Sequence, residues 1–182
     1  CKNWASRYPV NLQQYSESTD EINIYHFIDR LSALSGVGDV FIADAGSAFY
    51  AASQAIRLEK GNQRYLPSGA LATMGYSLPA AIGASAAAGD GRVLAITGDG
   101  SFQQNVQELA TLCHYRLPVK IFVLNNNGYL SIRASQRNYF AGRLIGESPE
   151  SGLGLPDAVR VAQAYGIETS RVGSLKHLDD AI

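Results

Sequence analysis

The sequence predicts an α/β domain with a three-layer, doubly wound architecture, in which helices cover both faces of a mostly parallel sheet. The run Val93–Thr97 is short and apolar on both faces, as buried parallel strands are, and Val40–Ala43 and Val119–Leu124 are two further short strands of mainly apolar residues. Segments with helical spacing of apolar residues lie between them, and such alternation is typical of parallel βα units. With 182 residues, the chain fits one domain with a substantial core.

The first half of the chain is expected to contain three helices and two strands. In order, we expect a helix over Ile22–Ser35, a strand over Val40–Ala43, a helix over Ala48–Leu58, a short strand over Gln63–Leu66 and a helix that begins near Leu78-Pro79. Gly36 and Gly38 end the first helix, and Pro79 suits the first turn of the third. A loop that contains Gly69 and Met74 precedes this third helix.

The second half of the chain continues the alternation. The expected elements are a strand over Val93–Thr97, a helix over Gln103–Tyr115, a strand over Val119–Leu124, a short helix after Tyr129, a loop over Ala141–Pro156, a helix over Asp157–Tyr165, a strand over Ile167–Val172 and a helix that begins near Leu175. Cys113 recurs at helical spacing with Val106 and Leu109, so it is predicted to be a small core residue.

The sequence is expected to be part of a longer protein. Residues 1–20 lack periodicity and are rich in Ser, Asn, Gln and Tyr, so we interpret them as a linker from an absent upstream domain. Residues 21–182 are interpreted as the domain itself. Because the sequence ends within a predicted helix, we expect this domain to be truncated at its C-terminus, with a further strand beyond Ile182.

Composition argues against several classes of function. The net charge is −1 and there is no basic stripe, so nothing indicates a nucleic-acid partner or an anionic membrane. The longest apolar run, Leu78–Ala88, is too short to span a bilayer. Cys1 and Cys113 form neither a metal-ligand pattern nor a disulfide framework. No signal peptide is visible, so we expect a cytoplasmic protein.

Two polar motifs follow neighbouring predicted strands. Gly98-Asp99-Gly100-Ser101 comes directly after Val93–Thr97, and Asn125–Tyr129 comes after Val119–Leu124. A right-handed crossover makes these strands parallel, so both motifs emerge at the carboxyl edge of the sheet, where ligands bind in open α/β sheets. Magnesium prefers all-oxygen coordination that is completed by substrate phosphates and water. The predicted protein ligands are the carboxylate of Asp99, the amide of Asn126 and the carbonyl of Gly128.

The position of the first motif distinguishes it from a simple turn. Asp-Gly is a turn signal, and Gly89-Asp90-Gly91 repeats the triplet between a helix end and a strand start, where a turn explains it. The later copy follows a strand, precedes a helix and is matched by asparagines on the next strand. A Rossmann fingerprint is excluded because Gln103 stands at its third glycine, and no Walker-type Gly-Lys-Ser/Thr occurs. The helix that opens after Ser101 is expected to direct N–H groups and its dipole towards a phosphate.

The segment GDGSFQQNVQELATL…LPVKIFVLNNNGY resembles the diphosphate–magnesium motif of thiamine-diphosphate-dependent enzymes. Upstream, Ser68–Ala84 is similar to the acetolactate synthase large-subunit group, and the similarity extends roughly over residues 22–130. The resemblance implies that residues 21–182 are a C-terminal diphosphate-binding (PP) domain with the thiamine-diphosphate-binding fold. It also implies thiamine diphosphate and Mg²⁺ as cofactors, with FAD possible in the full-length protein but not readable from these residues.

The resemblance assigns site residues position by position. It implies Asp99, Asn126 and Gly128 as metal ligands. The implied cofactor-binding residues are Gly46, Ser47, Ala48, Ala72, Met74, Gly98, Gly100, Ser101, Tyr129 and Leu130. Met74 would support the folded cofactor between its rings, although ordinary core filling explains a methionine equally well. No catalytic residue is expected in these 182 residues, because the activating glutamate of the family belongs to the pyrimidine-binding domain of a partner subunit.

The implied activity is decarboxylation or carboligation of 2-oxo acids by a homodimer or homotetramer of the full-length enzyme, with the isolated fragment inactive. The cofactor supplies a carbanion that attacks the 2-oxo acid and lets carbon dioxide leave. Ser131 and Ser135 stand where typical acetolactate synthases carry Met and Trp in the acceptor pocket, so a different 2-oxo acid is the alternative substrate. Arg133 and Arg137 are candidates for a substrate anion, with solvated helix arginines as the alternative. A non-catalytic, flavodoxin-like nucleotide-binding module also remains open, and it would not need Asn126.

Overall fold

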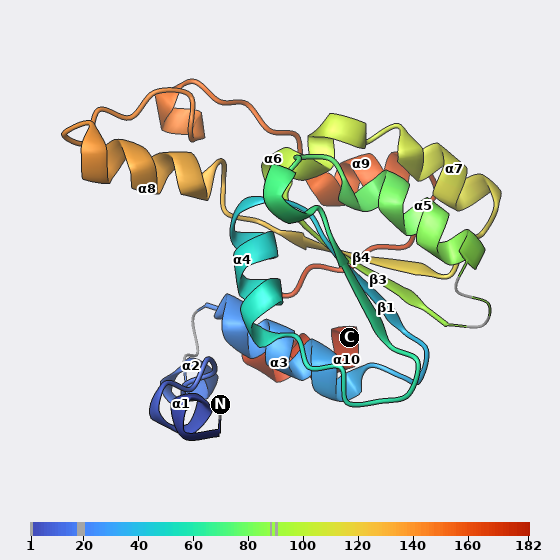
Figure 1. Cartoon of the computed structure of the whole chain (residues 1–182). Coiled ribbons are helices and arrows are strands. Elements are labelled where there is room, and N and C mark those ends of the chain that lie inside the picture. Colours follow the sequence, from blue (N-terminus) through green and yellow to red (C-terminus); the bar gives the residue numbers. More distant parts are fainter. Residues whose placement is uncertain (1, 18–20, 88, 90) are drawn as a thin grey trace.

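A four-stranded, all-parallel sheet forms the centre of the protein (Figure 1). The computed structural model describes residues 2–17, 21–87, 89 and 91–182. The strands are β1 (Val40–Ala43), β2 (Arg64–Pro67), β3 (Val93–Gly98) and β4 (Val119–Leu124), in the order β2-β1-β3-β4. Because β2 and β3 lie on opposite sides of β1, the sheet is wound in both directions from β1. The predicted fold class is confirmed.

Helices cover both faces of this sheet (Figure 1). The helices α3 (Ile24–Leu34), α4 (Gly46–Ala55) and α10 (Leu178–Ala181) pack on one face, and α5 (Ser77–Ala87), α7 (Glu108–His114) and α9 (Ala158–Ala164) pack on the other. Phe41 and Leu94 point to the first group, whereas Ile42 and Ala95 point to the second. Successive strand residues point to opposite faces, so runs that are apolar throughout suit a sheet covered on both sides.

The remaining elements lie at the edges and ends of the domain. They are α1 (Lys2–Arg7), α2 (Gln14–Glu17), α6 (Asp99–Phe102), α8 (Leu130–Tyr139) and the short 3₁₀ helices η1 (Gly69–Leu71), η2 (Gln103–Asn105), η3 (Pro149–Ser151) and η4 (Leu175–His177). The segment interpreted as a linker thus contains two short helices, and its predicted boundary at residues 18–20 lies outside the described residues. Helix α8 projects from the domain (Figure 1) and has no buried residue.

The prediction of one continuous helix over Gln103–Tyr115 is wrong, because α6, η2 and α7 replace it. The interruption coincides with a close approach of the loop at Gly75. A Cβ on Gly75 would lie 2.5 Å from Cβ of Gln104, and the Asn105 side chain donates a 2.8 Å hydrogen bond to the carbonyl of Gly75. The loop therefore occupies the space that a regular helix would need.

Two other predictions are also wrong. Residues 167–172 form no strand, and no backbone hydrogen bond joins them to β4 in the described part of the chain. Side-chain packing holds this extended segment instead, with Ile167 and Val172 in separate apolar clusters on the two faces of the sheet. Cys113 is exposed rather than buried, because the buried stripe of α7 is narrow and is formed by Leu109 and Leu112. Within the described ranges, no helix is both long enough and apolar enough to cross a membrane.

Candidate metal and diphosphate site

The predicted site lies at the carboxyl edge of the sheet, where the strand order reverses between β1 and β3. Asp44 follows β1, Asp99 follows β3, and the turn Asn125–Gly128 follows β4. In doubly wound sheets the crevice at this reversal is the usual ligand-binding position, because the connections leave the strands in opposite directions. Polar residues therefore collect where the architecture leaves room for a ligand.

Asp99 ties two of these strand ends together. Its Oδ2 atom accepts hydrogen bonds from the backbone N–H groups of Asn126, at 3.0 Å, and Gly128, at 2.9 Å. Its Oδ1 atom accepts from the N–H of Gly100, at 2.8 Å. A carboxylate offers about four lone-pair sites. Three are used here, so Asp99 can still coordinate a cation on the remaining side.

The turn after β4 leaves selected oxygen atoms without partners. From Asn126 to Tyr129, the carbonyl of Gly128 is the one that accepts no hydrogen bond from any described residue, although Gly128 is buried. The side chain of Asn126 likewise makes no hydrogen bond within the described part of the chain. Unpartnered buried carbonyls are rare, so this one calls for a ligand. Together with Asp99, these atoms fit a magnesium ion, which prefers a few oxygen ligands plus phosphate and water.

The described residues contain no group of three or more His, Cys, Asp or Glu side chains placed to hold a metal. Sites built from soft ligands suit zinc and other transition metals. A donor set with one carboxylate and two neutral oxygens carries a single negative charge. A divalent cation bound there would receive further negative charge from the diphosphate. The donor set therefore fits a hard cation that arrives with a diphosphate.

The glycine motif after β3 allows the side chain of Tyr129 to lie close to the backbone of Gly100. Gly100 lies beneath the ring of Tyr129, and the hydroxyl of Ser101 accepts a 2.9 Å hydrogen bond from the N–H of Gly75. Because that hydroxyl is used as an acceptor, its hydrogen stays available for a phosphate oxygen. Helix α6 has only four residues, so N–H groups rather than a long helix dipole act here, which differs from the predicted dipole contribution.

The second predicted diphosphate contact lies at the start of α4. Gly46 and Ser47 are the first residues of this helix, which is separated from the end of β1 by two residues, and Ala48 is buried. Ser47 also borders a cavity of about 440 Å³ between α4 and α8. The residues that line this cavity are Ser47, Tyr50, Leu130, Ser131, Ala134, Ser135, Asn138 and Tyr139.

Ala72 and Met74, the residues predicted to contact the rings of the cofactor, have fewer links to the metal-ligand residues. Ala72 and Met74 lie on the loop between η1 and α5, and both are half-buried. Ala72 adopts a left-handed backbone conformation with φ of 46°, which non-glycine residues adopt rarely. The bond from Gly75 to Ser101 fixes this loop to α6, next to Asp99. No hydrogen bond links Ala72 or Met74 to the ligand residues within the described ranges.

Sequence reasoning missed the role of Asp44, which is fully buried at the end of β1. Its Oδ2 atom accepts hydrogen bonds from the hydroxyls of Thr97, at 2.8 Å, and Ser77, at 2.9 Å, and its Oδ1 atom accepts from the N–H of Tyr76, at 3.3 Å. One carboxylate thus joins the ends of β1 and β3 to the start of α5. Its position after a buried strand, like that of Asp99, was the available signal.

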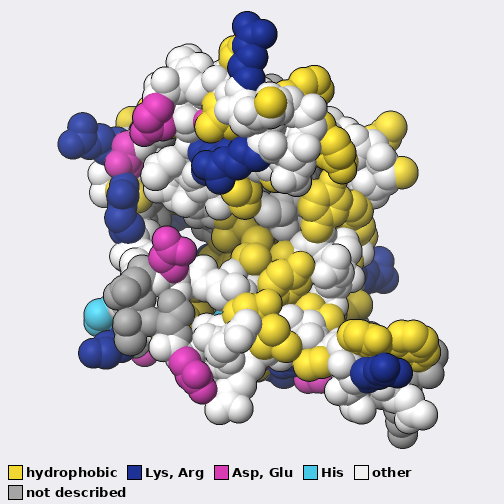
Figure 2. All heavy atoms as spheres, turned by 90° about the vertical axis from the view of Figure 1, so that its left-hand side faces the viewer, with side chains coloured by type: hydrophobic (Ala, Val, Ile, Leu, Met, Phe, Trp, Pro, Cys, Tyr) yellow, Lys and Arg dark blue, Asp and Glu magenta, His cyan; other side chains and the backbone are white. Residues whose placement is uncertain are grey.

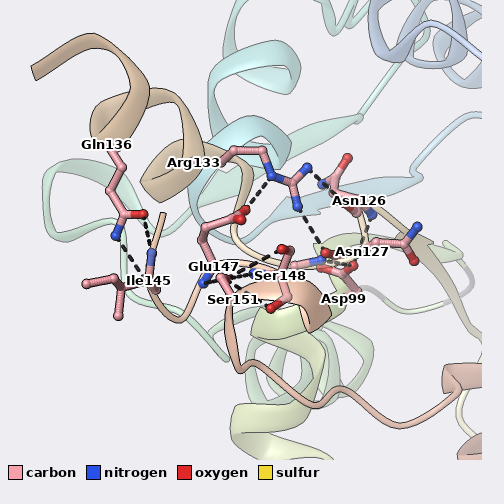
Figure 3. A network of polar contacts seen from close by, with 10 residues as sticks. Asp99, Asn126, Asn127, Arg133, Gln136, Ile145, Glu147, Ser148 and Ser151 are labelled. Carbon is pink, nitrogen blue, oxygen red and sulfur yellow. Dashed lines mark hydrogen bonds and ion pairs between the residues drawn. The ribbon is translucent and has the colours of Figure 1, made fainter. Parts of the chain in front are cut away.

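Sequence reasoning also missed the ion pair between Arg133 and Glu147, which Figure 3 shows beside the turn after β4. Arg133 forms an ion pair through its Nε atom with the nearly inaccessible carboxylate of Glu147 and donates to the carbonyls of Asn126 and Asn127. Burial raises the pKa of Glu147, but hydrogen bonds from Arg133 and Ser148 and the charge of Arg133 outweigh it, so this pKa lies below its ordinary value. No local sequence pattern predicts that Arg133 pairs with Glu147, because the two residues are fourteen positions apart.

Comparison with known proteins identifies the family of the chain. Residues 44–182 match the family model described as the C-terminal TPP binding domain of thiamine pyrophosphate enzymes, thiamine pyrophosphate being another name for thiamine diphosphate. The acetolactate synthase large subunit of Cyanidium caldarium is 35% identical over 179 residues, which is 98% of this chain and 29% of that protein.

Two further relatives agree. The acetolactate synthase isozyme 3 large subunit of Escherichia coli (strain K12) is 35% identical over 164 residues, 90% of this chain and 27% of that protein. An acetolactate synthase of Arthrospira platensis is 40% identical over 119 residues, 65% of this chain and 20% of that protein. The chain thus spans less than a third of the length of these relatives. It belongs to the thiamine pyrophosphate enzyme family, as an acetolactate-synthase-like C-terminal TPP binding domain.

Proposed function

We propose that this domain anchors the diphosphate of thiamine diphosphate through Mg²⁺, within an enzyme that acts on 2-oxo acids. The observation that carries the proposal is the unpartnered carbonyl of Gly128, beside the free side chain of Asn126 and the incompletely used carboxylate of Asp99. These atoms are the three ligands that the sequence motifs predict. In this proposal the cation neutralises the diphosphate, which otherwise would meet the negative charge of Asp99.

The other predicted residues have distinct tasks in this proposal. Gly98 leaves open space beside the backbone after β3 for the diphosphate, Ser101 donates a hydrogen bond to it, and Gly100 makes room for the Tyr129 ring and holds Asp99 through its N–H. The start of α4, with Gly46, Ser47 and Ala48, contributes N–H groups from the other side of the crevice. The backbone of Ala72 and Met74 meets the pyrimidine ring, and Tyr129 and Leu130 pack near the thiazolium. When bound, thiamine diphosphate supplies the nucleophilic carbanion that the protein alone lacks.

Catalysis requires a second domain in this proposal. No glutamate of this chain is assigned to activate the pyrimidine ring, so that residue is proposed to come from the pyrimidine-binding domain of a partner subunit in a homodimer or homotetramer. Apolar side chains are exposed on the face from which α8 projects (Figure 2), and Tyr50, Leu130 and Tyr139 are 53%, 41% and 79% exposed. Large exposed apolar patches mark interaction surfaces, which supports a partner here.

The substrate class follows from the cavity beside α8. Small side chains, Ser131, Ala134 and Ser135, form one wall of the cavity of about 440 Å³ that Leu130 and Ser47 also line. Small side chains along this wall leave room for a 2-oxo acid, or an acceptor, larger than pyruvate. We therefore propose decarboxylation or carboligation of such an acid, with acetolactate synthesis from pyruvate as the competing activity.

The test is calorimetric titration of the intact protein with thiamine diphosphate, in the presence of Mg²⁺ and in the presence of a chelator. We expect binding that requires the cation. Binding that is indifferent to the chelator, or preferential binding of a flavin or an adenine nucleotide, would favour the flavodoxin-like nucleotide-binding module and contradict the proposal.

A further inference from the structure

The backbone turn between β4 and α8 is held from both sides. The N–H groups of Asn126 and Gly128 point to Asp99, at 3.0 and 2.9 Å. The carbonyls of Asn126 and Asn127 point the opposite way, to Nη1 and Nη2 of Arg133, at 3.4 and 3.0 Å. In a planar trans peptide the N–H and C=O groups face in opposite directions. The N–H of Gly128 and the carbonyl of Asn127 belong to the same peptide, so its bond to Asp99 and its bond to Arg133 support each other.

The peptide between Gly128 and Tyr129 is held from one side only. The N–H of Tyr129 donates a 2.8 Å hydrogen bond to the backbone carbonyl of Glu147. By the same planarity, the carbonyl of Gly128 must face away from Glu147. It is the carbonyl that we assign to the cation. Its direction is therefore set by residue 147, which lies in a loop remote in sequence.

Glu147 is itself fixed firmly in place. Its N–H donates to the hydroxyl of Ser151, at 2.9 Å, and the side chain of Gln136 exchanges two hydrogen bonds with the backbone of Ile145, at 2.9 and 3.0 Å. Its carboxylate pairs with Arg133, and Arg133 in turn donates hydrogen bonds to the carbonyls of Asn126 and Asn127 in the turn (Figure 3). The loop over residues 145–151, helix α8 and the turn thus form one closed set of contacts.

We infer that Arg133 and Glu147 are positioning residues that set the direction of the Gly128 carbonyl and thereby the affinity of the site for a divalent cation. The inference rests on the proposed function and deepens it. Neither side chain is a metal ligand. Arg133 holds two carbonyls of the turn away from the site, and Glu147 holds Arg133 through its side chain and Tyr129 through its backbone.

This assignment gives Arg133 a role different from both earlier interpretations, which were a ligand for a substrate anion and a solvated helix arginine. The side chain of Arg133 is 19% exposed and is already paired with Glu147, so it is not free to bind a substrate anion. Arg137 lies one turn further along α8 and lines the same cavity as Arg133, but it makes no hydrogen bond or ion pair with any described residue. Arg137 is therefore a matched control for the charge of Arg133.

The experiment compares Arg133→Met, Arg133→Lys and Arg137→Met in the intact protein. Mg²⁺ is titrated at a fixed concentration of thiamine diphosphate, binding is followed by calorimetry, and the melting temperature of each variant is recorded without ligands. Residues that orient metal ligands typically change metal affinity by 10- to 100-fold. We expect both Arg133 variants to need about 10- to 100-fold more Mg²⁺ for half-maximal binding, because lysine lacks the planar fork with which Arg133 reaches Glu147 and the two carbonyls from separate nitrogen atoms.

The control and the recovery at high Mg²⁺ make the result specific. Arg137→Met should stay within about threefold of the wild type, and saturating Mg²⁺ should restore cofactor binding in the Arg133 variants, because the ligands remain. An equal shift in Arg133→Met and Arg137→Met would indicate long-range charge alone and overturn the inference. Wild-type Mg²⁺ dependence in a folded Arg133 variant would also overturn it. Absence of Mg²⁺-dependent binding in the wild type would instead contradict the proposed function.

Discussion

The ring of Tyr129 covers Gly100 so closely that a Cβ on Gly100 would lie 2.2 Å from Cε1 and 2.8 Å from Cδ1 of that ring. The contact joins the motif after β3 to the motif after β4. Gly100 has an ordinary helical backbone within α6, so the space beside it, rather than its φ angle, requires a glycine.

Gly100→Ala should therefore displace the Tyr129 ring and destabilise the protein by about 1–3 kcal/mol, the usual cost of overpacking. Urea unfolding of the free protein measures this free energy. Gly98→Ala is the control within the same motif, because a Cβ there would meet nothing within 4 Å. Equal stability of the two variants would show that Tyr129 moves aside without cost.

Asp99→Ala should abolish Mg²⁺-dependent binding of thiamine diphosphate, because it removes the anionic ligand and the acceptor for two N–H groups of the turn. Calorimetry of the intact protein checks this result. Glu108→Gln, which changes a carboxylate that accepts from Thr111 on α7, should bind as the wild type does. Cation-dependent binding of wild-type strength in Asp99→Ala would refute the metal assignment.

Thr97→Val should destabilise the protein by about 1–3 kcal/mol, since it removes a hydroxyl donor from the buried carboxylate of Asp44 and leaves that charge less well satisfied. Denaturant unfolding gives the free energy directly. Thr73→Val, at an exposed position, is the control and should have little effect. A neutral Thr97→Val would mean that Asp44 is satisfied by Ser77 and Tyr76 alone.

Stability should depend on pH through Asp39, which is 2% exposed. Burial raises its pKa, but hydrogen bonds from Arg92 and from the N–H of Gly36 outweigh this effect, so the pKa of Asp39 lies below its ordinary value in the folded protein. The folded state then binds this proton less readily than the unfolded state. The contribution to stability is complete above the unfolded pKa, near 4, and is lost as the pH falls through the folded pKa.

Comparison with Asp39→Asn isolates this term. The difference in free energy of unfolding between wild type and variant should be largest near neutral pH and should shrink as the pH falls below about 4. Chemical unfolding in a series of buffers measures it, and a difference that stays constant with pH would exclude the ion pair as its source.

Substrate choice should respond to the wall of the cavity between α4 and α8. The intact enzyme should make little acetolactate from pyruvate, and Ser135→Trp should reduce turnover of larger 2-oxo acids more than turnover of pyruvate, because it fills part of about 440 Å³. A panel of 2-oxo acids, assayed by carbon dioxide release, provides the comparison. Ser174→Trp, outside the cavity, is the control. Efficient condensation of pyruvate by the wild type would contradict this prediction.

Much of the fold could be predicted because its strands carry strong local signals. Val93–Thr97 is apolar on both faces, Val119–Leu124 is apolar except for Lys120, and the crossover rule makes the two strands parallel, which brings Asp99 and Asn126 to one edge. Their adjacency in the structure, through the 3.0 Å bond between Asp99 and the N–H of Asn126, agrees with that reasoning.

The errors arose where tertiary contacts override local pattern. The helix predicted over Gln103–Tyr115 breaks where Gly75 packs on Gln104, which no sequence period reveals. Residues 167–172 begin and end with the β-branched Ile167 and Val172, but these side chains pack from an extended chain that forms no ladder. Glu147 lies in a loop, and its pairing with Arg133 depends on how that loop folds back.

The doubly held turn after β4 has a thermodynamic consequence. The backbone of residues 126–129 is already ordered by Asp99, Arg133 and Glu147 before any cation arrives. Binding to a rigid site avoids the conformational entropy that ordering a loop would cost. Cation binding should therefore resemble the filling of a preformed cage, with a small change in heat capacity and without the signature of coupled folding.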